Sequence, residues 1–246
     1  MSVSLGDMIL SPSKILYIKS LNAVVLADSH IGLEYALADE GTFIPPIQYG
    51  HMKKKLLAAV KRFDPEKIII VGDLKHMFSQ RTLQEHREVI DMLKTLKKIG
   101  IEIILVRGNH DNFIVGILER HGVNFVREYS EGGYLFIHGH AAPTGDIDTY
   151  EKVVMGHLHP TITLSDFVAR EKLPVFLVGD KIVVLPAFTP LLPGFDVLTG
   201  VYEDSTYGSP LVVDVSDFGV YVIIEDKRVV NFGKISDLLD VRGAFL

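Results

Sequence analysis

Short apolar runs rich in Val, Ile and Leu alternate with longer amphipathic stretches through the first half of the chain. This alternation is typical of buried strands joined by crossover helices, and it predicts an α/β unit. The expected strands are Ala23 to Ala27, Lys67 to Val71, Ile101 to Val106, Tyr134 to Ile137 and Val153 to Met155. The expected helices between them are Tyr49 to Lys61 and Arg81 to Lys98.

After Pro160 the pattern changes to short apolar runs separated by Gly, Pro and Asp, which is typical of antiparallel strands and hairpins. These runs are Val175 to Val178, Ile182 to Leu185, Leu211 to Val215 and Tyr221 to Ile224. We expect an α/β fold in which a parallel half and a more antiparallel half pack as a two-sheet β-sandwich flanked by helices. Residues 1–246 are expected to form a single domain, and the bend at Pro186, Pro190 and Pro193 a surface loop that could border the active site.

Composition limits the chemistry that this chain can use. It has no cysteine, which excludes disulfides, thiolate nucleophiles and cysteine zinc sites, so any metal must be held by nitrogen and oxygen atoms. A net charge of −6 disfavours a surface that binds nucleic acid everywhere, but it is compatible with a local basic patch. There is no apolar run of about 20 residues and no leader-like start, so we expect no membrane partner and a cytoplasmic protein.

Polar residues cluster where the predicted strands end. Because the carboxyl ends of parallel strands meet at one edge of a sheet, residues far apart in sequence are expected to converge there. Their imidazole, carboxylate and amide groups suit Mn, Fe, Zn, Co or Ni better than Ca or Mg alone. The eight residues are Asp28, His30, Asp73, Asn109, His110, His138, His157 and His159.

Five local sequences around these residues, taken in order, resemble the signature of calcineurin-like metallophosphoesterases. The resemblance runs from Asp28 to His159, somewhat over half of the chain, and it implies the fold of that superfamily with two bound divalent metal ions. The five sequences are Ala27-Asp28-Ser29-His30, Gly72-Asp73, Gly108-Asn109-His110-Asp111, His138-Gly139-His140 and Gly156-His157-Leu158-His159.

The same resemblance assigns a role to each residue of the centre. By it, Asp28, His30 and His159 would hold the first metal, and Asn109, His138 and His157 the second. Asp73 would bridge the two ions, and a bridging hydroxide would be the nucleophile. His110 would be the general acid, with Asp111 hydrogen-bonded to it and orienting it. Manganese is the expected metal.

The segment from Asp28 to Pro46 resembles the archaeal and bacterial ICC-like branch of these enzymes, through Ile31-Gly32-Leu33-Glu34 and Gly41-Thr42-Phe43-Ile44-Pro45-Pro46. Some bacterial relatives in that branch are associated with DNA ligase and helicase partners. This resemblance favours a phosphodiesterase acting on nucleotides or nucleic acid. Asn109, His76, His140 and Arg107 are candidates for substrate contact, whereas His51, His86 and His121 are expected to be surface or packing residues.

Other functions remain open at this level. A phosphomonoesterase acting on a small metabolite or phosphoprotein would use the same metal ligands. A non-catalytic scaffold on this fold is expected to lack ligands, and here all seven are present. An endonuclease would need a cap to hold DNA, and the roughly 85 residues after His159 are few for one. A homo-oligomer would be compatible with exposed strands in the second half.

Overall fold

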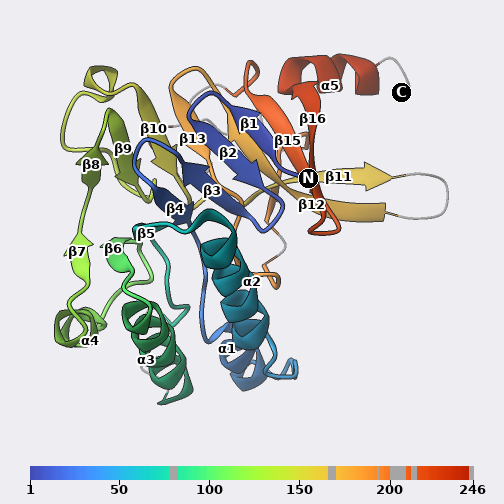
Figure 1. Cartoon of the computed structure of the whole chain (residues 1–246). Helices are drawn as coiled ribbons and strands as arrows, with labels where there is room; N and C mark the ends of the chain where they lie inside the picture. The colour runs from blue at the N-terminus through green and yellow to red at the C-terminus, as the bar shows by residue number, and fades with distance from the viewer. Residues whose placement is uncertain (78–82, 166–169, 193, 200–208, 212–214, 244–246) are drawn as a thin grey trace.

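The computed structural model describes residues 1–77, 83–165, 170–192, 194–199, 209–211 and 215–243. Two sheets lie face to face, with helices on their outer sides (Figure 1). The fold class expected from the sequence, a two-sheet α/β sandwich with mixed parallel and antiparallel strands, is confirmed.

The first sheet has seven strands in the order in which they occur along the chain. Strands β1 to β4 are paired antiparallel, and β4 to β7 are paired parallel. The bounds are β1 (Val3–Leu5), β2 (Met8–Ser11), β3 (Ile15–Ile18), β4 (Ala23–Leu26), β5 (Lys67–Val71), β6 (Glu102–Val106) and β7 (Asn124–Val126). Helices α1 (Leu33–Asp39) and α2 (Gln48–Phe63) connect β4 to β5, and α3 (Leu83–Lys98) and α4 (Val115–Arg120) make the next two crossovers.

Among the described residues the second sheet has nine strands, in the order β14-β11-β12-β13-β10-β9-β8, with β15 paired to β12 and β16 paired to β15. The strands β9, β10 and β13 run parallel at its centre, and β11 is parallel to β14. The bounds are β8 (Tyr129–Glu131), β9 (Tyr134–Ile137), β10 (Lys152–Met155), β11 (Pro160–Ser165), β12 (Arg170–Val178), β13 (Ile182–Val184), β14 (Phe195–Asp196), β15 (Gly219–Ile224) and β16 (Arg228–Lys234). A short 3₁₀ helix, Ile147–Thr149, precedes β10, and α5 (Ile235–Gly243) follows β16.

Three apolar clusters separate these layers. The first packs α2, α3 and α4 on the outer face of the first sheet, the second fills the space between the sheets, and the third lies between the second sheet and α5. Phe136, for example, is fully buried between the sheets. Burying such a side chain stabilises the fold by about 1.5–3 kcal/mol, so the sheets are held firmly against each other.

Two expectations from the sequence need correction. Parallel and antiparallel pairing do not divide by chain half, because β1 to β4 already form an antiparallel meander and β13, in the second half, is parallel to β10. The bend that begins at Pro186 is not a surface loop along its whole length, because Pro186 to Thr189 are buried. Phe188 and Thr189 donate backbone hydrogen bonds to the carbonyls of Ala27 and Asp28. Of the expected strand Leu211 to Val215, residues 212–214 lie outside the described residues.

Candidate metal centre

The predicted metal ligands stand on turns that follow the carboxyl ends of β4, β5 and β6 in one sheet and of β9 and β10 in the other. Five of them have a left-handed backbone, which L residues adopt rarely. Strain of this kind costs about 1–3 kcal/mol per residue and concentrates at functional sites. The five are Asp28 (φ 56°), His30 (43°), Asp73 (51°), His157 (69°) and His159 (46°).

Glycines let the turns approach one another closely. A Cβ on Gly108 would lie 2.1 Å from Oδ1 of Asp73, and one on Gly72 would lie 2.2 Å from Nδ1 of His138. Neither contact is possible without moving a predicted ligand. These glycines are therefore required by the geometry of the site, and not only by the turns themselves.

Asp28, His30 and His159 form the first cluster, and their ligand atoms lie within 4.8 Å of one another. Nε2 of His159 is 3.2 Å from Oδ1 of Asp28 and 3.4 Å from Nε2 of His30. Burial lowers the pKa of His30 to about 3, so its ring is neutral and offers a lone pair near neutral pH. Oδ2 of Asp28 accepts a hydrogen bond from the backbone N–H of His157, which ties the first cluster to the second.

Asp73, His138 and His157 form the second cluster. Nε2 of His138 lies 3.3 Å from Oδ2 of Asp73 and 3.1 Å from Oδ1 of Asn109. Nδ1 of His138 donates to the carbonyl of Val71 at 2.9 Å, which leaves Nε2 as the atom that faces the other groups of the cluster. Burial lowers the pKa of His138, but its hydrogen bond to Asp73 and the charge of Asp28 outweigh that effect and raise the pKa to about 9.

Asp73 lies between the two clusters. Its Oδ2 is 3.6 Å from Nε2 of His30 in the first cluster and 3.3 Å from Nε2 of His138 in the second. Burial raises the pKa of Asp73, but the hydrogen bond and charge of His138 and the charge of His30 hold it well below its usual range. The carboxylate is therefore ionised and faces both clusters.

His110 and Asp111 contact the backbone of neighbouring turns. The carboxylate of Asp111, which we expected to orient His110, accepts hydrogen bonds from the backbone N–H groups of Asp73, Leu74 and Gly108 at 2.8–2.9 Å. It fixes the turns after β5 and β6 against each other. Nδ1 of His110 instead faces the carbonyl of His76, and the two rings stack 5.4 Å apart. Burial and the charge of Asp73 raise the pKa of Asp111 to about 6.

Of the four candidates for substrate contact, Asn109 contacts His138 in the centre and the other three lie around it. His76 reaches into it, with Nδ1 3.2 Å from Nδ1 of His30, and burial and then the charge of His110 lower its pKa to about 4. His140 and Arg107 are exposed and line a small pocket with His138. Arg107 donates to Oδ1 of Asn112 at 3.0 Å, and no salt bridge to it is found among the described residues.

Two polar residues near the ligands could not be found from the sequence. Gln48 is buried and donates from Nε2 to the carbonyl of His30 at 3.3 Å and to the hydroxyl of Thr189, which is also buried. Both residues hold the loop that carries His30. Neither stands in a recognisable motif, since one begins α2 and the other lies within the Pro-rich bend. His121, expected to be a packing residue, contacts the carbonyl of Ile117 through Nδ1.

The donor set fits two divalent metal ions. Two groups of converging imidazole and carboxylate atoms share an ionised aspartate, and Oδ1 of Asp28 is buried without a hydrogen bond among the described residues. Such a buried oxygen is costly unless a cation or donor satisfies it. The arrangement defines the class of the protein as a metal-dependent hydrolase with its centre at one edge of a two-sheet α/β fold.

Comparison with known proteins agrees with this class. The model of the calcineurin-like phosphoesterase family matches residues 21–215. The solved structure of the nuclease MPE from Pseudomonas putida aligns with a TM-score of 0.67 and 22% identity over 94% of this chain and 99% of that chain. The phosphoesterase Yfce from E. coli aligns with a TM-score of 0.40 and 13% identity over 86% and 98%. The comparison with curated proteins gave no match.

The chain belongs to the calcineurin-like phosphoesterase family and is a hydrolase that acts on phosphate esters. Within the part of the chain that the structure describes, no helix is both long enough and apolar enough to span a bilayer.

Proposed function

We propose that this protein is a dinuclear metal-dependent phosphodiesterase whose substrates are nucleotides or nucleic acid. The observation that carries the proposal is the position of Asp73, whose carboxylate faces both His clusters at once. A single-metal site does not need a carboxylate shared between two groups of ligands. A scaffold would not need the five strained turns either.

In this proposal Asp28, His30 and His159 hold one ion, Asn109, His138 and His157 hold the other, and Asp73 bridges them. When bound, two Mn²⁺ ions would neutralise the phosphoryl oxygens and lower the pKa of a water molecule, which supplies the nucleophile. The protein's own contribution is to hold these ligands rigidly before substrate arrives. The hydrogen bonds from backbone amides to Asp111 and Asp28 serve that purpose.

His110 is the proposed general acid. Its Nδ1 donates to the carbonyl of His76, so the ring is held with a defined tautomer and Nε2 is the atom that would exchange a proton with the substrate. Protonating the leaving oxygen matters more for an ester of a poor leaving group, such as a nucleotide sugar hydroxyl, than for an activated one.

The preference for a diester rests on the nuclease from Pseudomonas putida, which shares the fold and is consistent with such a substrate. His140 and Arg107 lie beside His138 at the rim of the centre. The test is hydrolysis of a chromogenic phosphodiester and of the matching monoester by EDTA-stripped protein, with and without added Mn²⁺. We expect metal-restored cleavage with the diester preferred. A preference for the monoester would make the protein a phosphatase. If neither ester is cleaved although two metals are bound, the non-catalytic scaffold is the function that remains.

A further inference from the structure

Two exposed arginines stand beside the metal centre, in a pocket that we call the arginine pocket. Its wall is formed by Arg107, Arg127 and His140, and it reaches His138, a predicted ligand of the second metal. Arg107 follows β6 in the first sheet and Arg127 precedes β8 in the second, so the pocket opens where the two sheets meet. An anion bound here would lie next to a phosphate held at the metals.

Both guanidinium groups keep most of their capacity to donate hydrogen bonds. Arg127 donates to the carbonyl of Ala142 at 3.2 Å and lies 3.9 Å from Glu128, yet 65% of its side chain is exposed. Arg107 is exposed and donates to Asn112. These contacts use a minority of the five N–H donors of each arginine, whose planar fork matches phosphate oxygens. The chain as a whole has a charge of −6, so this local pair of cations is not a consequence of a basic surface.

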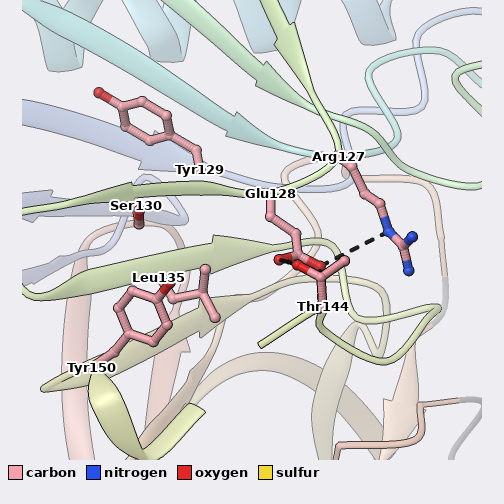
Figure 2. Close-up of a pocket in the computed structure, with 7 residues that line it drawn as sticks. All are labelled: Arg127, Glu128, Tyr129, Ser130, Leu135, Thr144 and Tyr150. Carbon is pink, nitrogen blue, oxygen red and sulfur yellow. Dashed lines mark hydrogen bonds and ion pairs between the residues drawn. The ribbon is translucent and has the colours of Figure 1, made fainter. Parts of the chain in front are cut away.

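A second pocket adjoins the first on the far side of Arg127, and we call it the tyrosine pocket. Arg127 and Glu128 line both pockets. Figure 2 shows the Tyr150 ring beside Leu135, with Glu128 and Thr144 at the mouth. Tyr129 points to the opposite side of β8, where it packs in the cluster between the sheets. Both tyrosines are among the lining residues, and Tyr150, whose ring also packs partly on the cluster between the second sheet and α5, is the one beside Leu135.

The two pockets differ in their balance of charge. Arg127 and Glu128 line both, but Arg107 lines only the arginine pocket, so that pocket has one more cation and suits a phosphate better. In the tyrosine pocket Glu128, which accepts hydrogen bonds from the backbone and hydroxyl of Thr144, stands against a single arginine. A nucleobase, with a flat apolar face and polar edges, suits that pocket better, and base stacking on an aromatic ring is worth about 1–3 kcal/mol. The arginine pocket has the opposite preference.

We propose that the arginine pocket binds the phosphate adjacent to the scissile one in a single-stranded nucleic acid, and that the tyrosine pocket receives the nucleoside beyond it. This inference rests on the proposed phosphodiesterase function and narrows its substrate class to polynucleotides. A duplex cannot place an unpaired base against Tyr150, so single strands are the substrate.

The test compares a short single-stranded DNA with a chromogenic phosphodiester, which has only one phosphate. The variants are the double substitution Arg107→Ala/Arg127→Ala and, as a matched control, Arg228→Ala, an exposed arginine of β16 that lines neither pocket. In the double variant we expect kcat/KM for DNA to fall about tenfold more than kcat/KM for the small diester. The slope of log KM against log salt should also fall by about 0.7, which corresponds to one phosphate of a single strand that is no longer neutralised. Arg228→Ala should change neither quantity.

Tyr150 is tested separately. Tyr150→Ala should lower kcat/KM for DNA several-fold with little change for the small diester, and Tyr150→Phe, which keeps the ring, should restore it. Equal losses for both substrates in the arginine variant, or an unchanged salt slope, would overturn the proposal. Cleavage of the diester with none of DNA would overturn it while the phosphodiesterase function stands. If neither substrate is cleaved, the proposed function fails. The arginine pocket is then tested by the affinity for labelled DNA, measured by fluorescence anisotropy in the wild type and in the double arginine variant. Equal affinities would overturn the pocket as well.

Discussion

The metal centre and the arginine pocket meet at His138, yet they are built in opposite ways. In the centre, Asp28, Asp73 and His138 are at most 2% exposed, and backbone N–H or carbonyl groups hold each side chain in place. In the pocket, Arg127 is 65% exposed and is held by one carbonyl and one distant carboxylate.

This difference in burial assigns the reaction itself to the metal centre and the choice of substrate to the arginine pocket. Buried ligands on strained turns cannot shift without disturbing both sheets, so the centre is suited to a reaction whose geometry must be exact within fractions of an ångström. Exposed arginines cost little to rearrange and act mainly through charge, so they are suited to holding the rest of a substrate. Changes in the centre should therefore affect every phosphate ester, and changes in the pocket only the longer ones.

The largest effect is expected from Asp73→Asn. The amide keeps the shape of the side chain but removes the negative charge that faces both His clusters, so metal content should fall and kcat/KM for the small diester should drop at least about 10⁴-fold. Kinetics beside metal analysis by mass spectrometry measures both, with Asp146→Asn in an exposed loop as the control. Two bound metals with undiminished activity in Asp73→Asn would show that the site is wrongly assigned.

His110→Ala tests whether the centre separates metal binding from proton transfer. Loss of a general acid should lower kcat about 10³-fold for a poor leaving group and less for nitrophenolate, while metal content stays near that of the wild type. The measurement is kcat of His110→Ala for an ester with a poor leaving group and for the nitrophenyl ester, each relative to the wild type. A loss that is equal for both leaving groups would argue against proton donation by His110.

Gly108→Ala tests how far the centre depends on close approach of its turns. A Cβ would meet Oδ1 and the backbone nitrogen of Asp73 at 2.1 Å and 2.4 Å, so Asp73 must move, and a displacement of about 1 Å can cost about 10²-fold in rate. Gly50→Ala in α2, where nothing lies within 4 Å, is the matched control and should stabilise the fold by about 0.5–1 kcal/mol. Activity and melting temperature of both variants are to be measured. Full activity in Gly108→Ala would show that the turn tolerates movement.

Asp111→Asn is expected to have the smallest effect of the four. An amide nitrogen would face a backbone N–H in place of an accepting oxygen, which costs about 1–3 kcal/mol, or a few degrees in melting temperature at about 2–4 °C per kcal/mol. Activity should fall about tenfold, because Asp73 and Gly108 are held less firmly. If kcat fell as far as in His110→Ala with the melting temperature unchanged, Asp111 would act on His110 after all.

The sequence predicts the buried region better than the exposed one. Strands β5 and β9 were predicted with their observed bounds, and β4 and β10 to within one residue, because continuous apolar runs that end in polar residues are a strong local signal. The short strands β1 and β7 carry no such signal. The backbone partners of Asp111 were not predicted, because hydrogen bonds to the backbone depend on how two turns meet. Arg127 was not predicted as part of the rim for the same reason, since the pairing of β6 with β7, which sets Val106 opposite Val126, brings it near Arg107.

The central claim, that seven residues hold two metals and that both are needed, is tested most directly by titrating EDTA-stripped protein with Mn²⁺. Bound metal and hydrolysis of the small diester are measured in the same samples. The account predicts two ions per chain at saturation and activity that appears only as the second ion binds. Full activity with one ion per chain, or with none, would contradict it.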